Sequence, residues 1–158
     1  MTSLPWEEIE PEFMARARRI VWCTVATVDT SGKPRTRILH PLWEGTTGWI
    51  ATGRHSLKEK HLAANPHVSL SYWDPQQQNV YVEAMAQWED DPETKRRIWA
   101  LFGSTPEPAG YNLGDFFPGG PDGVWGLLKL TPSRIELSGM ADAAAGLPMR
   151  RVWRAMTD

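Results

Sequence analysis

The sequence has little of what marks several specialised classes of protein. It contains one cysteine and four scattered histidines in 158 residues, which excludes an intrachain disulfide framework and argues against a zinc site. Its formal net charge is −2, so it lacks the basic surplus of proteins that bind nucleic acids or membrane surfaces. No apolar run approaches the roughly 20 residues of a membrane-spanning helix. The acidic start, Pro5 to Glu10, does not resemble a signal peptide, so we expect a cytoplasmic protein.

Tryptophan, in contrast, is abundant. The chain has nine, and aromatic side chains fill cores, interfaces and sites for flat rings. Trp43, Trp73 and Trp153 are candidates to stack on a flat ligand, although core packing is the more common role for any one of them. The lone Cys23 lies in an apolar strand pattern and is expected to be a buried thiol rather than a nucleophile. The length predicts a single domain over residues 1–158.

Hydrophobic periodicity predicts many short strands with helices inserted singly. The strands are expected at residues 20–28, 35–40, 49–52, 67–73, 79–88, 124–130, 134–137 and 150–155. The helices are expected at residues 10–19, with its arginines facing outward, at 56–64, and after a cap at Asp90. Strands 35–40 and 49–52 are expected to form a hairpin, and strands 124–130 and 134–137 to be separated by a kink at Thr131-Pro132. Such a pattern is typical of an antiparallel β-barrel with accessory helices.

Residues 103–120, called the excursion below, are rich in glycine and proline. They include Tyr111, Phe116 and Phe117, and one helical turn is expected at Leu113–Phe117. Irregular stretches of this length usually cover a site or carry function. We therefore expect the excursion to border a ligand cleft and shape access to it.

The most informative stretch is Ser31 to Pro66. Its first strand carries Arg35 and Arg37, and Ser56 is placed to cap the following helix in a capping box with Glu59. A helix N-terminus flanked by Lys58 and by arginine side chains can hold a phosphate. On composition alone, however, arginines on a strand are more often solvated, and a serine here can be a simple cap.

A resemblance favours the phosphate interpretation. Thr52-x-x-x-Ser56-x-Lys58, after an Arg-x-x-x-Leu strand, resembles the FMN-phosphate site of the pyridoxamine 5'-phosphate oxidase-like, FMN-binding split-barrel family, over roughly residues 20–137. The resemblance implies a six-stranded antiparallel split β-barrel with accessory helices, assembled as a homodimer with FMN in clefts between subunits. It implies cofactor contacts from Arg35, Arg37, Ile38, Leu39, His40, Thr52, Ser56 and Lys58. The family has an arginine before the lysine, where this chain has Leu57.

Further contacts are implied across the dimer interface. Asn79, with Gln78 as the alternative, corresponds to an amide that reaches the flavin edge, although both are also ordinary turn residues. The terminal strand resembles the family's last strand, where basic residues approach cofactor or substrate, so Arg151, Trp153 and Arg154 are also candidates. The arginine-x-histidine pair with which the true oxidase binds its phosphorylated substrate is absent near this end. The resemblance therefore implies an oxidoreductase of an unidentified small molecule, not a pyridoxamine phosphate oxidase.

Two alternatives remain at the level of sequence. Relatives of the same barrel use the deazaflavin coenzyme F-420, whose acidic tail would need a basic groove, for which Arg54, Lys58, Lys60 and His61 are candidates. Other relatives would bind flavin or haem without turnover, as carriers or sensors. No side chain stands out as a nucleophile or general base, as expected where a cofactor ring carries the chemistry.

Overall fold

The computed structural model describes residues 3–156. The elements in chain order are α1 (Trp6–Ile20), β1 (Cys23–Val28), β2 (Pro34–Leu39), β3 (Leu42–Glu44), β4 (Thr47–Thr52), α2 (Leu57–Ala64), β5 (His67–Tyr72), β6 (Asn79–Trp88), α3 (Pro92–Ser104), the 3₁₀ turn η1 (Leu113–Asp115), β7 (Gly126–Ser138), α4 (Met140–Ala144) and β8 (Arg150–Arg154). Within the described range, no helix is both long enough and apolar enough to cross a membrane.

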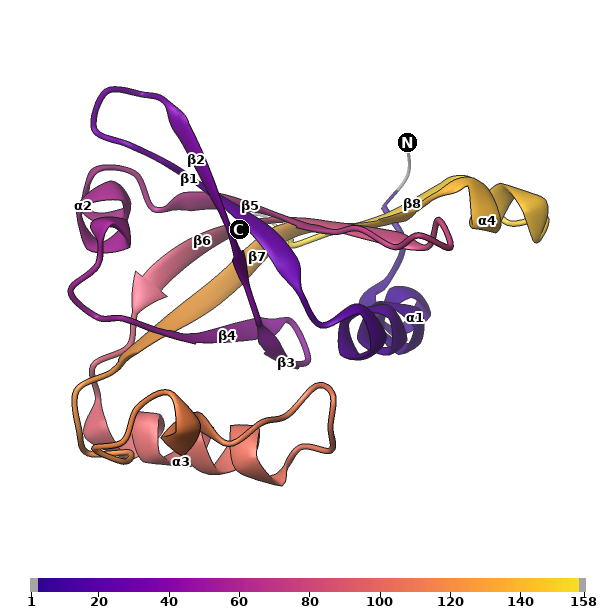
Figure 1. The fold of residues 1–158 in the computed structure, drawn as a ribbon. Helices are drawn as coiled ribbons and strands as arrows, with labels where there is room; N and C mark the ends of the chain where they lie inside the picture. The colour runs from indigo at the N-terminus through magenta and orange to yellow at the C-terminus, as the bar shows by residue number, and fades with distance from the viewer. Residues whose placement is uncertain (1–2, 157–158) are drawn as a thin grey trace.

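The strands form one antiparallel sheet in the order β2-β1-β5-β6-β7-β4-β3, with β8 added to β7. The sheet curls into a half-barrel with helices at its ends and along one side (Figure 1). The predicted antiparallel barrel with accessory helices is confirmed, with eight strands in place of the six expected. The two end strands, β2 and β3, are joined only by His40 and Pro41. Such a link spans at most about 11 Å, so the two edges of the curled sheet approach each other there.

The predicted hairpin between residues 35–40 and 49–52 is wrong. β2 pairs instead with β1, from Val28↔Pro34 to Cys23↔Leu39, and the hairpin partner of β4 is the three-residue strand β3. Asp29 closes the β1–β2 turn, because its Oδ1 accepts hydrogen bonds from the backbone N–H groups of Ser31 and Lys33, both at 2.9 Å. A three-residue strand is too short to show periodicity, so β3 could not be predicted from the hydrophobic pattern.

The expected break at Thr131-Pro132 is also absent, since β7 runs unbroken through both residues. The irregularity is a bulge within β7: Glu83 of β6 pairs with Arg134 and Ala84 with Pro132, which leaves Ser133 as the extra residue. A bulge of this kind accommodates a proline, which cannot donate a ladder hydrogen bond.

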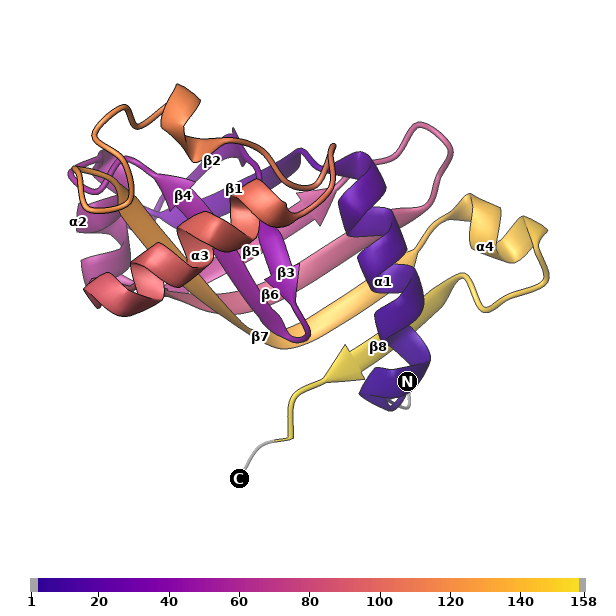
Figure 2. The same cartoon turned by 90° about the horizontal axis from the view of Figure 1, so that it is seen from below.

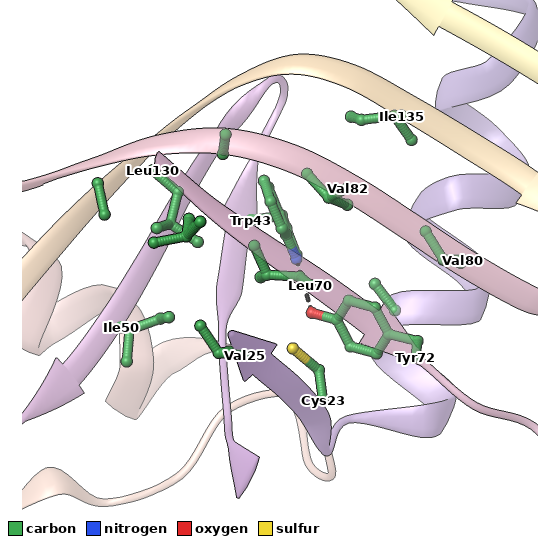
Figure 3. Close-up of a cluster of buried hydrophobic side chains, with 14 of the residues drawn as sticks. Cys23, Val25, Trp43, Ile50, Leu70, Tyr72, Val80, Val82, Leu130 and Ile135 are labelled. Carbon is green, nitrogen blue, oxygen red and sulfur yellow. Dashed lines mark hydrogen bonds between the residues drawn. The ribbon is translucent and has the colours of Figure 1, made fainter. Parts of the chain in front are cut away.

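The main core lies inside the curl (Figure 3). Alternate residues of the strands meet there, including Val25, Leu70 and Val82, each at most 3% exposed. Trp43 also lies in this core and donates its indole N–H to the Tyr72 hydroxyl at 2.9 Å, so it does not stack on a ligand. Cys23 is a buried free thiol, as predicted, and burial raises its pKa to about 12.

The first helix is longer than predicted and places one arginine differently. α1 begins at Trp6, with Glu7 and Glu8 in the first turn. Acidic side chains at this end stabilise a helix, because they lie near the positive end of its dipole. Ile9 and Phe13 face the core as expected. The expectation that all arginines face outward is wrong for Arg16, which is 2% exposed.

Arg16 is buried because it has partners on three elements. It binds Glu12 within α1, Asp142 of α4 at 2.5 Å, and the backbone carbonyl of Asn79 at 2.9 Å. Arg151 of β8 contacts the same two carboxylates. Burial alone would raise the pKa of Glu12, but hydrogen bonds from Arg151 and Arg16 hold it below its usual value. This charge cluster ties α1, α4 and β8 to the end of β6.

A second core packs α3 and the excursion against the β3–β4–β7 side of the sheet (Figure 2). It is formed by Leu42, Trp49, Ile98, Phe102, Ala109, Leu113, Trp125 and Leu127. The cap of α3 is Asp91, whose carboxylate accepts from Thr94 N–H at 2.9 Å. The prediction that Asp90 is the cap is wrong. The carboxylate of Asp90 pairs with the guanidinium of Arg54 at 3.0 Å instead of accepting from the first N–H groups of α3.

Candidate functional site: an anion cradle beside an aromatic cleft

The N-terminus of α2 presents an unpartnered hydroxyl. Ser56 occupies the cap position, as predicted, but makes no side-chain cap hydrogen bond. The predicted capping box is wrong, because the carboxylate of Glu59 binds Arg54 at 2.9 Å instead of turning back to Ser56. Ser56 Oγ is buried and has no hydrogen-bond partner among residues 3–156. Buried hydroxyls are rarely left unpaired, so this atom marks a place where a ligand is expected.

Two cations flank this helix end without a carboxylate to neutralise them. Among residues 3–156, neither Arg37 nor Lys58 forms an ion pair. Arg37 is half-buried on β2, and burial lowers its pKa. The pKa of Lys58 is lowered by burial and, second, by the positive charge of Arg37. The positive charge of Arg37 thus disfavours the protonated form of Lys58, and an anion bound near both groups would offset this repulsion.

Arg37 is held in place by neighbouring strands. Its Nη1 donates to Thr27 Oγ1 at 2.8 Å and to the carbonyls of Arg35 and Val25 at 3.1 and 3.2 Å. Thr27 Oγ1 in turn lies 2.9 Å from His61 Nδ1 on α2. Because Thr27 accepts from Arg37, its own proton is free to be donated to His61. Sequence reasoning did not single out Thr27, since a threonine in a strand gives no functional signal.

Arg35, also predicted as a phosphate ligand, has a different environment. Its side chain is exposed and pairs with Asp29 at 3.1 Å. It lines a shallow hollow of about 340 Å³ together with Arg37, Lys60 and His61. The structure thus places Arg37, rather than Arg35, as the unneutralised arginine beside Lys58.

A larger cleft of about 810 Å³ lies next to the end of β2. One side of the cleft is lined by Ile38, Leu39 and His40, at the end of β2, and by Ala51 of β4. Thr52, the next residue, is buried at the end of β4 and leads through Gly53, Arg54 and His55 to Ser56. The chain therefore connects the cleft directly to the anion cradle formed by Arg37, Ser56 and Lys58.

The excursion forms the opposite wall, through residues 107–117. His40 fastens it to the sheet: its Nε2 donates to the carbonyl of Ala109 at 2.6 Å, and its ring lies against that of Tyr111, with centroids 4.6 Å apart. Burial lowers the pKa of His40, so at neutral pH the imidazole is uncharged. The expectation that the excursion borders a cleft agrees with this geometry, although the helical turn is shorter than predicted, at Leu113–Asp115.

Asn79 and Trp153 do not join this site within one chain. Asn79 begins β6, and Figure 1 shows that the β5–β6 turn and α2 lie at opposite ends of the sheet. The Oδ1 of Asn79 accepts from Asp74 N–H at 2.8 Å. Trp153 packs edge-on against Trp6, with centroids 5.4 Å apart. Their predicted contacts with a cofactor would have to be made across an interface and stay predictions.

Comparison with known proteins gives the family. A family model described as "Pyridoxamine 5'-phosphate oxidase" matches residues 9–115. The chain belongs to this family, and the resemblance inferred from residues 31–66 is confirmed. No curated protein matches the sequence significantly.

Solved structures share the fold at low sequence identity. A Clostridium acetobutylicum protein related to general stress protein 26 has a TM-score of 0.72 and 15% identity, covering 94% of this chain and 95% of that one. A pyridoxamine 5'-phosphate oxidase-related, FMN binding protein from Nostoc punctiforme has a TM-score of 0.63 and 16% identity, covering 89% and 86%. A protein described as an F420 reductase has a TM-score of 0.54 and 17% identity, covering 77% and 93%.

Proposed function

We propose that this protein is an FMN-dependent oxidoreductase that acts on a small molecule. The observation that carries the proposal is the buried, unpartnered hydroxyl of Ser56 beside the unneutralised charges of Arg37 and Lys58. A phosphate would satisfy all three groups and the first N–H groups of α2. The FMN-binding description of the Nostoc relative supports this choice of ligand.

The residues present fit the cofactor. Arg37, Ser56 and Lys58 would hold its phosphate, with Thr52 beside them, and the apolar surface of Ile38, Leu39 and Ala51 would accept a flat ring. When bound, FMN would supply hydride transfer through its ring. The protein would contribute binding and exclusion of water, and no residue is assigned as a catalytic acid or base.

The cleft offers no site for a phosphorylated substrate. Its charged lining residues, within the described part of the chain, are Arg19 and Glu107. Arg19 is already paired with Asp74 at 2.9 Å. This supports the inference that the protein is not a pyridoxamine phosphate oxidase.

A deazaflavin reductase is the second candidate, supported by the F420 reductase relative. The predicted basic groove is weakened in this structure, because Arg54 is neutralised by Asp90 and Glu59 and His61 is buried against Thr27. Lys58 and Lys60 alone would remain to meet an acidic tail. A flavin or haem carrier without turnover is the third candidate, supported by a haem storage protein from Vibrio cholerae that shares the fold.

The absorbance spectrum of the purified protein, followed by mass spectrometry of the released ligand, tests the proposal. We expect flavin absorbance and the mass of FMN. A colourless preparation that binds deazaflavin but not FMN would support the second candidate, and a haem Soret band the third. Turnover of added electron acceptors by the FMN-loaded protein would separate an enzyme from a carrier.

We also propose that the protein is a cytoplasmic homodimer. Large apolar side chains lie exposed around one hollow of about 530 Å³: Ile38 of β2 is 59% exposed, Trp22, just before β1, 61%, and Trp73, just after β5, 64%. Contiguous apolar surface of this kind marks an interface. A second copy with the same face would cover it symmetrically.

Light scattering at micromolar concentration with FMN present is expected to give twice the chain mass of 17.8 kDa. Trp73→Glu should shift the mass toward the monomer, because it places a charge in the proposed interface. Val124→Glu, at an exposed position outside this face, is the control. A monomer mass for the unaltered protein would contradict the homodimer.

The excursion gives a further prediction. Phe116 is 67% exposed and lies at the edge of the cleft, so Phe116→Ser should change the rate at which artificial electron acceptors reoxidise the reduced flavin. FMN affinity should stay within a few-fold, because the anion cradle is untouched. Replacing all of residues 110–117 by a Gly-Ser turn is a harsher test, since it also removes buried Leu113. An unaltered reoxidation rate in stable Phe116→Ser protein would contradict the role in access.

A further inference from the structure

One side of the cleft is lined by aromatic side chains that are not part of the anion cradle. Tyr111 lies at its centre, tilted by 33° against His40 and edge-on to Phe102 and Phe116, with centroids at 5.3 and 5.6 Å. These neighbours leave the Tyr111 ring little freedom, and His40 fixes the backbone beside it through Ala109. The ring is therefore a rigid part of the cleft rather than a loose loop side chain.

Tyr111 is half-buried and lines the cleft. Its pKa is raised to about 12 by burial alone, with no contribution from a hydrogen bond to another described residue. At neutral pH the phenol keeps its proton and is a hydrogen-bond donor. A half-buried donor without a partner selects ligands that bring an acceptor.

The charges around the cleft restrict that ligand further. Arg19 is paired with Asp74 and also donates to Gln78 at 3.0 Å, and Glu107 is exposed at the margin. The lining therefore offers no free cation to an anionic group, whereas its rings and aliphatic side chains suit a flat apolar molecule. The volume of about 810 Å³ lies within the usual range for small-molecule sites, about 300–1,000 Å³.

We propose that the cleft binds a flat, uncharged aromatic compound with a carbonyl oxygen, and that Tyr111 determines specificity by donating its hydroxyl proton to that oxygen. This deepens the proposed function, since it names the substrate class of the same cleft. Tyr111 belongs to the excursion and lies outside the stretch from Ser31 to Pro66 that carried the predicted phosphate site.

Calorimetry with three probes tests the assignment on FMN-free and FMN-loaded protein. Coumarin is flat, uncharged and carries a carbonyl; coumarin-3-carboxylate adds a negative charge; naphthalene lacks the acceptor. Tyr111→Phe should weaken coumarin binding about three- to tenfold, the loss of one neutral hydrogen bond, and leave naphthalene binding within about twofold. Tyr81→Phe, at a tyrosine on the outer face of β6, is the matched control.

The unaltered protein should also prefer coumarin to its carboxylate, a comparison that does not depend on any variant folding. Coumarin binding that is absent, unchanged in Tyr111→Phe, or weaker than binding of the carboxylate would overturn the proposal. FMN affinity is measured in parallel by flavin fluorescence. If the protein does not bind FMN but binds coumarin in a way that Tyr111→Phe weakens, the result counts against the proposed cofactor alone. If it binds FMN normally but Tyr111→Phe leaves coumarin binding unchanged, the result counts against this inference alone.

Discussion

Lys58→Ala is expected to weaken FMN binding by about tenfold or more while the fold stays intact. A charge-assisted hydrogen bond to a phosphate contributes about 1.5–3 kcal/mol, and 1.4 kcal/mol corresponds to tenfold in affinity. Lys58 forms no ion pair in the described structure that its loss would break, and removing it relieves the repulsion with Arg37. Flavin fluorescence titration measures the affinity. Lys60→Ala, an exposed lysine of the same helix, is the control.

Ser56→Ala separates a ligand site from a simple helix cap. Replacing a capping serine by alanine usually costs about 1 kcal/mol of stability. Here Ser56 Oγ has no partner, so the melting temperature of FMN-free protein should hardly change, while FMN affinity falls. A lowered melting temperature of Ser56→Ala with unchanged FMN affinity would identify Ser56 as a structural cap. If the FMN affinity of Lys58→Ala is unchanged as well, the anion cradle is refuted.

Asp142→Ala is expected to cause the largest loss of stability. It leaves Arg16, which is 2% exposed, with only one carboxylate partner, Glu12, itself shared with Arg151. Removing one member of a buried ion pair typically costs about 3–5 kcal/mol, because the remaining charge stays desolvated. For a chain of this size that corresponds to a fall in melting temperature of roughly 6–20 °C.

Asp122→Ala is the matched control for this variant. It also removes a carboxylate from an arginine, but both Arg96 and Asp122 are exposed, and exposed pairs contribute about 0–1 kcal/mol. Calorimetry of the two variants should therefore differ by several degrees. Equal melting temperatures would show that the cluster of Arg16, Glu12, Asp142 and Arg151 does not hold α1, α4 and β8 to the sheet.

Local sequence signals predicted an anion site at the N-terminus of α2, but they did not predict the partners of each residue in it. The pattern of Ser56 and Lys58 after a short strand was enough to predict a phosphate site, because a helix N-terminus is a local feature. Which arginine serves it was not predictable. Arg35 and Arg37 lie on the same side of β2. The β1–β2 turn brings the carboxylate of Asp29 to Arg35 and not to Arg37, so the charge of Arg37 stays without an ion-pair partner among the described residues.

Long-range partners account for the errors of prediction. Arg16 was expected to face solvent because its burial depends on Asp142, 126 residues away along the chain. The capping box failed because Arg54 draws Glu59 away from Ser56. The hairpin is a separate case: β3 is only three residues long, and it pairs with β4 across the short turn at Gly45 and Thr46, which leaves β2 to pair with β1.

The sequence by itself determined the antiparallel strands, the inserted helices and the family, since period-two alternation, caps and turn residues act over a few neighbours. The tertiary structure decided which groups remain without partners. Ser56 and Lys58 were candidates from the sequence, and the structure adds that, among the described residues, Ser56 Oγ has no hydrogen-bond partner and Lys58 no ion-pair partner. The Tyr111 hydroxyl became a candidate only through the structure, which places its residue in the lining of the cleft. Whether a polar group is satisfied depends on every element around it, and for that reason only the folded chain reveals it.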